Sequence, residues 1–239
     1  AGKRTAGEAA IQQVFRDRAA KRRHGFEYTP AFGRGLATGR AMEELLDRFL
    51  PAWDVRERHG VDVRAPAELV LRLAREFDLN SLWPVRFIFW LRGVLLRAGG
   101  RPLESRGLVD YTRSLGWGLL AEVPGEEIVM GALTQPWQPD VVFRPIASDS
   151  FASFGEADHV KIAWNLRVIP APGTAGCRFS TETRVAACDA VARAHFRRYW
   201  RLFSFGIIAI RLLMLPALKR RAERLSTMNY GGPSRFGSP

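Results

Sequence analysis

Cysteine and histidine are scarce in this sequence, which limits the chemistry that it can support. There are 2 cysteines and 4 histidines among 239 residues, and we find no histidine paired with a cysteine or a carboxylate at metal-ligand spacing. Cys177 and Cys188 stand at the two ends of one predicted strand, roughly 35 Å apart, so they cannot form a disulfide with each other. The residues therefore predict no metal site, and two isolated thiols suit a reducing compartment such as the cytosol.

Motifs of the common nucleotide-dependent and hydrolytic enzymes are also missing. There is no Walker loop, no dinucleotide fingerprint and no nucleophile elbow, and residues 116–118 (Gly-Trp-Gly) resemble the entry into a strand rather than a phosphate cradle. The first residues are polar and basic, without the apolar stretch of a secretory signal. We therefore expect a cytoplasmic protein without a cofactor, and a binding protein rather than an enzyme.

Lysine is rare as well, and the positive charge is unevenly placed. The 36 basic residues, nearly all of them Arg, outnumber 24 acidic residues and give a net charge of +12. Residues 1–41 hold nine Lys/Arg against three Asp/Glu, and residues 219–239 hold five against one, so the middle of the chain is nearly neutral. Since a nucleic-acid-binding fold carries its basic stripe on the folded domain, we expect charged, solvated ends and no specific nucleic-acid binding.

What the sequence does contain is a pair of long strands followed by a long helix. Val160–Val168 alternates apolar and polar residues, and Cys177–Ala187 does the same after a Pro/Gly turn, as antiparallel strands with one buried face do. The helix that starts near Asp189 has apolar residues at 192, 196, 199, 203, 207, 210 and 214, which share one face. We expect this face to pack on the sheet and to leave room for a cavity between sheet and helix.

The polar face of the two strands has two interpretations. It carries Lys161, Arg167, Glu182 and Arg184, and cross-strand ion pairs on a solvent-exposed face explain all four. If this face lines the cavity instead, the same side chains would orient a ligand.

Further strands and short helices are predicted before this pair. We expect strands at Trp53–Val63, Trp117–Val123 and Glu126–Thr134, a short edge strand within Gln135–Pro145, and helices at Ala9–Arg23, from Pro66, across Pro84–Ala98 and at Leu108–Leu115. Gly25–Arg40 is rich in glycine, contains Pro30 and has no clear period, which favours a loop.

These patterns divide the chain into three parts. Residues 1–41 form a basic N-terminal extension that is either mobile or not native, and residues 42–225 form one ligand-binding domain. Residues 226–239, rich in Asn, Gly, Pro and Ser, are expected to be a disordered tail.

Three stretches of the sequence resemble the START/Bet v 1-like superfamily, also called SRPBCC or polyketide cyclase/dehydrase-like. They are residues 60–70 (GVDVRAPAELV), in which a strand runs into a helix through Ala-Pro-Ala-Glu, the late strand 178–185 (RFSTETRV), and the closing helix 190–215. The resemblance covers about residues 50–225 and implies an α+β helix-grip fold, in which a curved antiparallel sheet wraps around a long C-terminal helix. It does not settle the function, because the superfamily includes lipid carriers, hormone receptors and cyclases.

Candidate site residues follow from the predicted cavity. We choose Met130, Trp164, Phe179, Phe196 and Tyr199 as its ligand-binding lining, although each is also explained as plain core. The weak candidates for catalysis are His195, as a general base, and Tyr199, whose hydroxyl could donate to a ligand carbonyl. The alternative for His195 is a boundary histidine that is hydrogen-bonded to the backbone.

The sequence leaves three functions open. The first is binding of an apolar small molecule, lipid or polyketide-like, in an internal cavity without clear catalytic machinery. The second is a cyclase/aromatase-type enzyme that acts on a polyketide-like substrate. The third is peripheral contact with an anionic membrane through residues 207–224, where an apolar run of twelve residues, Ile207–Leu218, too short to span a bilayer, precedes a basic flank.

Overall fold

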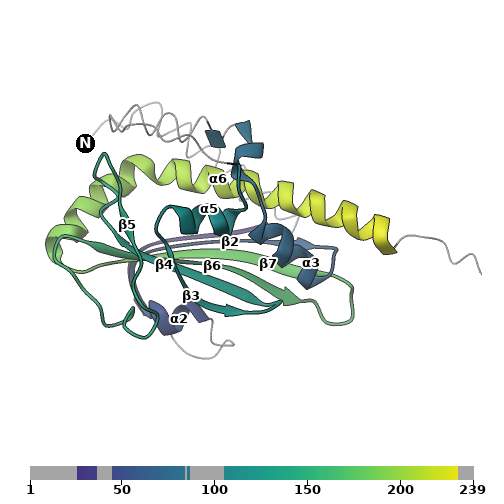
Figure 1. The fold of residues 1–239 in the computed structure, drawn as a ribbon, viewed down its shortest axis with the longest axis horizontal. Helices are drawn as coiled ribbons and strands as arrows, with labels where there is room; N and C mark the ends of the chain where they lie inside the picture. Colours follow the sequence, from purple (N-terminus) through teal and green to yellow (C-terminus); the bar gives the residue numbers. More distant parts are fainter. Residues whose placement is uncertain (1–25, 37–44, 84, 87–104, 231–239) are drawn as a thin grey trace, which may run out of the picture.

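The computed structural model describes residues 26–36, 45–83, 85–86 and 105–230, which form an antiparallel sheet crossed by one long helix (Figure 1). The sheet has seven strands in the order β1-β2-β7-β6-β4-β3, with β5 paired to β4. The strands are β1 (Phe26–Leu36), β2 (Ala52–Val63), β3 (Gly118–Val123), β4 (Glu127–Thr134), β5 (Phe143–Arg144), β6 (Val160–Pro170) and β7 (Cys177–Ala187). Helix α6 (Ala190–Tyr230) lies along one face of this sheet, so the expected α+β helix-grip fold is confirmed.

The other helical segments of the described chain are short. They are α2 (Leu45–Phe49), α3 (Ala67–Arg75), the 3-10 turn η2 (Leu79–Ser81) and α5 (Leu108–Ser114). Helix α3 starts directly after Pro66, at a position where the missing N–H costs nothing, as the sequence predicted. The helix expected across Pro84–Ala98 lies outside the described residues except for two positions, and so does the one expected at Ala9–Arg23.

The face of the sheet that packs on α6 carries two apolar clusters. The first lies under the beginning of the helix, and its members include Val55, Val160, Val185, Ala192, Phe196 and Trp200. The second also packs on α3, and its members include Val61, Val70, Leu166, Phe179, Leu215 and Leu218. Burial of these side chains is the main favourable term that holds the helix on the sheet.

The opposite face of the sheet is covered as well. Helix α2 and the segment before β6 pack on it through a third apolar cluster, whose buried members are Leu46, Phe49, Leu50, Leu120, Val129, Phe151 and Ala163. All eight residues of β4 are consequently buried, although only alternate ones face α6.

The charged side chains of β6 and β7 lie on this covered face, and the interpretation of their face as solvent-exposed is wrong. Glu182 and Arg184 are only 2 % and 1 % exposed. Glu182 Oε1 accepts from Arg56 Nε at 2.7 Å and from Arg184 Nε at 2.6 Å. Arg184 Nη1 in turn donates to Asp47 Oδ1 of α2 at 2.6 Å. Since this face lies opposite α6, Glu182 and Arg184 do not line a cavity under that helix either. Their ion pairs hold α2 on the sheet.

Two further predictions about secondary structure are wrong. Phe26–Leu36 is not a loop but the edge strand β1, paired with β2 across a register shift between Phe32 and Gly35. Pro30 is tolerated there because an edge strand has one side that needs no ladder hydrogen bonds. Helix α6 passes Pro216 and runs to Tyr230, into the segment expected to be disordered.

Both cysteines are free, as their separation predicted. Burial raises the pKa of the Cys177 thiol to about 11, so this side chain behaves as an inert apolar group of the core.

The buried network on the α2 side gives a stability prediction. Replacing Glu182 by Gln leaves the guanidinium of Arg184 in the interior with less compensating charge, and we expect the free energy of unfolding to fall by about 3–5 kcal/mol. Urea denaturation of both proteins measures the difference. The matched control is Asp62→Asn, which removes the exposed Asp62–Arg178 pair and should cost less than about 1 kcal/mol. Equal losses in the two variants would contradict the buried network.

Candidate functional site

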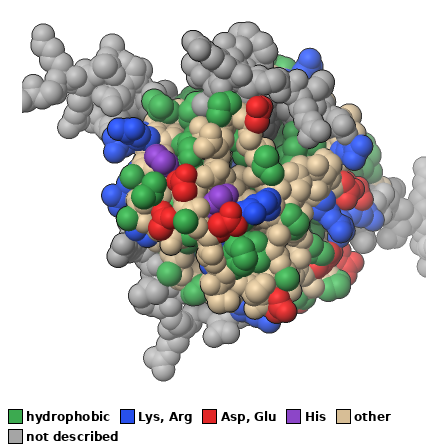
Figure 2. Space-filling view, turned by 60° about the vertical axis from the view of Figure 1, so that its left-hand side comes forward, with side chains coloured by type: hydrophobic (Ala, Val, Ile, Leu, Met, Phe, Trp, Pro, Cys, Tyr) green, Lys and Arg blue, Asp and Glu red, His purple; other side chains and the backbone are tan. Residues whose placement is uncertain are grey.

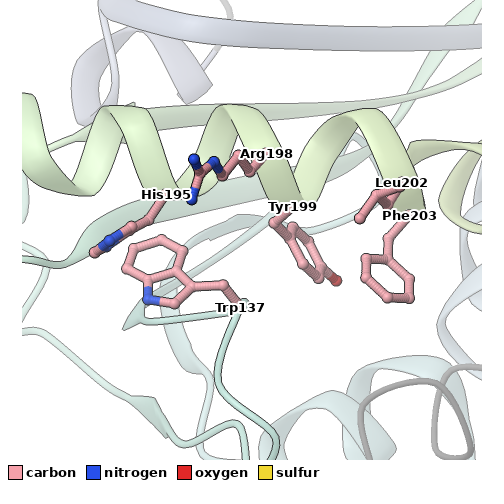
Figure 3. A pocket seen from close by; sticks show the side chains of 6 residues that line it. All are labelled: Trp137, His195, Arg198, Tyr199, Leu202 and Phe203. Atoms are coloured by element: carbon pink, nitrogen blue, oxygen red, sulfur yellow. The ribbon is translucent and has the colours of Figure 1, made fainter.

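An open cleft lies between the first half of α6 and the turn that follows β4 (Figure 3). Its volume is about 210 Å³, and it is lined by Trp137, His195, Arg198, Tyr199, Leu202 and Phe203. All but Trp137 come from α6, where spacings of three and four residues place them on one side of the helix. Trp137 faces them from the turn, and its ring lies 5.4 Å from that of His195. The cleft therefore has aromatic walls with a histidine at one end.

His195 is held by a carboxylate rather than by the backbone. Its Nδ1 lies 2.9 Å from Oδ1 of Asp158, and the imidazole remains 43 % exposed. The sequence shows no such pair, because Asp158 is distant from His195 in the chain and only the fold brings it to α6. In the tautomer with a proton on Nδ1, the free Nε2 can accept a proton from a molecule in the cleft.

The backbone of Asp158 is fixed in an uncommon conformation. Its φ is 55°, in the left-handed region, which Asp tolerates better than most residues. Asp158 N–H donates to Asp189 Oδ2 at 2.7 Å, and its carbonyl accepts from Gln135 Nε2 at 2.7 Å. Asp189 also caps α6 by accepting from Ala192 N–H, and the two N–H donors lower the pKa of this carboxyl, the Ala192 donor foremost. The carboxylate of Asp189 therefore holds both the first turn of α6 and the backbone of Asp158, the partner of His195.

A second group of polar residues lies deeper, on the face of the sheet beneath α6. Glu57 and His59 of β2 and Thr181 and Thr183 of β7 are all buried. In the sheet register they fall between the Val55–Val185 pair of the first apolar cluster and the Val61–Phe179 pair of the second. We call these four residues the polar band. It interrupts an otherwise apolar interior across two adjacent strands.

Helix α6 sends one charged side chain to the polar band. Nη2 of Arg211 donates to Thr183 Oγ1, and Nη1 donates to the carbonyl oxygen of Glu57 at 3.3 Å. Arg211 interrupts the apolar run 207–218, and its position is explained by this contact. The pairing gives the helix a fixed register on the sheet, since a shift by one residue would leave the guanidinium among apolar side chains.

Glu57 and His59 stand two residues apart on the same face of β2, with Oε2 of Glu57 3.7 Å from Nε2 of His59. Burial lowers the pKa of His59, so the imidazole is neutral near pH 7. Among the residues that the structure describes, Oε2 of Glu57 is buried and accepts no hydrogen bond. A buried acceptor without a hydrogen bond is rare in folded proteins, and this one could accept a hydrogen bond from a ligand hydroxyl.

The five predicted lining residues fall into both apolar clusters. Met130, Trp164 and Phe179 belong to the cluster near α3, and Met130 and Trp164 are direct neighbours across β4 and β6. Phe196 and Tyr199 belong to the cluster under the beginning of α6, and only Tyr199 lines the cleft. Their role in ligand binding stays a prediction.

Five residues of the cleft and the polar band were not predicted from the sequence: Trp137, Asp158, Glu57, His59 and Arg211. Glu57 and His59 carried a usable signal, since residues two apart on a strand share a face, and Arg211 was a charge within an apolar run. No local pattern could reveal Asp158 or Trp137, because their positions depend on how the turns fold back. Within the described ranges, no group of three or more His, Cys, Asp or Glu side chains could hold a metal ion.

Comparison with known proteins gives no functional assignment. No family model matches the chain, and no curated protein does. Among solved structures, DR_A0006 from Deinococcus radiodurans is similar with 19 % identity over 60 % of this chain and 93 % of that one, at a TM-score of 0.26. CalU16 from Micromonospora echinospora is similar with 9 % identity over 86 % of this chain and 99 % of that one, at a TM-score of 0.28. At these scores neither carries an argument, and the helix-grip fold rests on the topology described above.

The neutral, buried His59 makes stability depend on pH. Its pKa is lowered in the folded protein, so below the ordinary value of 6.5 the unfolded chain binds a proton that the folded one does not, and stability falls with falling pH. Between pH 7.5 and 5.5 we expect this histidine to lower the free energy of unfolding by at most about 1.4 kcal/mol, the limit for a side chain that binds no proton in the folded protein. Denaturant titrations of the protein and of His59→Gln measure it: the variant should lose that part of the slope. In the control, His195→Gln, the half-exposed histidine is replaced and the slope should persist.

Proposed function

We propose that the protein binds an apolar small molecule with at least one polar group, of the lipid or polyketide-like class, between the sheet and α6. The polar band is the observation that carries this proposal. Four buried polar residues and Arg211 sit between two apolar clusters on the one face of the sheet that a helix-grip fold uses to hold ligands. Natural ligand sites have this composition, mostly apolar walls with a few placed polar groups.

The cleft supplies the entrance. Tyr199 and Phe203 line the cleft and also pack in the cluster that contains Val55 and Val185. The polar band begins at the next inward-facing pair of the same strands, Glu57 and Thr183. An apolar ligand that enters beside Trp137 would first pass Tyr199 and Phe203. The end of the ligand that enters first, its leading end, would then reach the polar band.

The chemistry of the polar band suggests what this leading end carries. The guanidinium of Arg211 donates hydrogen bonds only, which suits a carbonyl or carboxylate oxygen. An ionised carboxylate such as that of Glu57 can only accept hydrogen bonds, which suits a hydroxyl as the ligand group beside Oε2. A lipid acid or a polyketide-like molecule provides groups of both kinds on an apolar body.

Arg211 is the residue to test. The probe is cis-parinaric acid, a fluorescent fatty acid with one carboxylate. Since a hydrogen bond to a charged group contributes about 1.5–3 kcal/mol, Arg211→Met should weaken its binding by about tenfold or more. The matched control Arg220→Met removes an exposed arginine of the same helix and should bind as the unchanged protein does.

Native mass spectrometry of the freshly purified protein then looks for a ligand acquired during expression. A bound mass that Arg211→Met loses and Arg220→Met retains supports the proposal. Equal binding of the probe by both variants, with the fold of each verified by circular dichroism, would refute a role of the polar band.

A second candidate function is supported by the Asp158–His195 pair. A carboxylate that orients an imidazole beside Tyr199, in an open cleft, is the arrangement of a general acid–base site. A cyclase/aromatase-type enzyme acting on a polyketide-like substrate would use it to move a proton from carbon to oxygen and so start ring closure.

This candidate is tested with a linear poly-β-ketone thioester and chromatographic detection of cyclised product. We expect His195→Gln to lower the rate by about 10²–10⁴-fold, and Asp158→Asn to lower it less, since Asp158 acts through the imidazole. The control is His159→Gln, which changes a histidine outside the cleft. Cyclisation at the same rate in His195→Gln would exclude this chemistry.

A further inference from the structure

Helix α6 is apolar on its outer side as well as on the side that packs on the sheet. Leu202 and Phe205 are 76 % and 59 % exposed, and Ala209 and Leu212 continue at the same helical spacing and are half-buried. We call these four residues the outer strip. A helix that packs on a soluble domain usually carries polar residues on the side facing away from it. Packing among the residues that the structure describes therefore does not explain the outer strip.

The helix as a whole has unusually high hydropathy for its burial. Between Ala190 and Met228 it is long and apolar enough to cross a membrane, by length and composition only. An 18-residue window within it has a mean hydropathy of 1.8, and only 22 % of this window is buried. The apolar segment of α6 is thus longer than the twelve-residue run Ile207–Leu218.

Basic residues lie at both ends of the outer strip. Arg197, Arg198 and Arg201 precede or adjoin Leu202, and Arg220, Arg221 and Arg224 follow one to two turns after Pro216; all six are exposed. In all, α6 contains nine Lys/Arg and one acidic residue, Glu223. Figure 2 shows hydrophobic and basic side chains, with acidic ones among them, on one face of the molecule. Apolar residues between clusters of Arg are the composition of helices that lie in a membrane interface.

We propose that the outer side of α6 docks on an anionic lipid bilayer, with the outer strip in the acyl boundary and the arginines at the headgroups. The helix lies on the membrane and does not cross it, because Met214, Leu215 and Leu218 are buried against the sheet side and Arg211 is bonded to β2 and β7. A second copy of the chain fits this surface poorly, since two such helices would bring arginine clusters of the same sign together. Nucleic acid fits it poorly because Leu202 and Phe205 stand between the arginines.

The test is co-sedimentation of the full chain with vesicles of phosphatidylglycerol and phosphatidylcholine (3:7) and with vesicles of phosphatidylcholine alone. We expect binding to the anionic vesicles that weakens as salt is raised. Leu202→Ser with Phe205→Ser should lower the partition coefficient about tenfold or more, through the lost apolar burial. Arg201→Gln with Arg220→Gln should lower it about fivefold for each charge.

Matched controls change similar residues elsewhere on the surface. Val142→Ser with Phe154→Ser removes exposed apolar side chains outside α6, and Arg86→Gln with Arg113→Gln removes exposed arginines outside it. Both controls should bind vesicles as the unchanged protein does, and circular dichroism should show the same helix content in all variants.

Three results would overturn the proposal. The first is no binding to anionic vesicles, or equal binding to both kinds of vesicle. The second is loss of a dimer, measured by light scattering, in the Leu202/Phe205 variant while vesicle binding is unchanged, which would assign the outer strip to a second copy. The third is salt-dependent binding of duplex DNA that requires the arginines, with vesicle binding indifferent to Leu202 and Phe205. Leu202 also lines the cleft, so ligand binding by the Leu202/Phe205 variant is measured separately, and its outcome does not decide among these three results.

Discussion

Because both faces of the central strands are covered, a polar side chain on β6 or β7 has no route to water and must find its partner inside the protein. On one face, Glu182 and Arg184 are paired in an ion network that also holds α2 on the sheet. On the other face, Thr183 is reached by Arg211 from α6. Each layer that covers the sheet is thus positioned by the polar groups that it covers, and the apolar clusters fill the space around these fixed points.

Helix α6 contributes to three features of the molecule. Its first turns carry His195 and Tyr199 to the cleft, its middle delivers Arg211 to the interior, and its outer side presents Leu202 and Phe205. The middle of α6 has apolar residues on its inner and its outer side, and its charged residue, Arg211, contacts the polar band. The cleft, the polar band and the outer strip therefore all involve α6, and the polar band and the outer strip lie on opposite sides of this helix, one helix diameter or roughly 10 Å apart.

Much of the fold could be predicted because strand alternation and helix spacing are local. Strands β2, β3, β4, β6 and β7, the short α5 and the start of α3 agree with the expected segments to within a few residues. The polar face of β7 was misjudged, because alternation shows that two faces differ but not what covers the polar one. Strand β1 was missed because Gly and Pro are local loop signals, whereas pairing with β2 is not local. The site shows the same limit: His195 and Tyr199 were predicted from helix spacing, but Asp158 and Trp137 reach them only through tertiary structure.

Strand β1 has one more effect, on the side of the sheet where it lies. It occupies the backbone hydrogen-bonding groups of β2 that face away from β7. Without it, β2 would present a long row of unpaired N–H and C=O groups at the rim of the sheet, a template on which a strand from another molecule can form. Residues 26–36 thus take the place of β2 at the edge of the sheet, and Pro30, which has no N–H to donate, makes β1 a poorer template for such pairing than β2 would be.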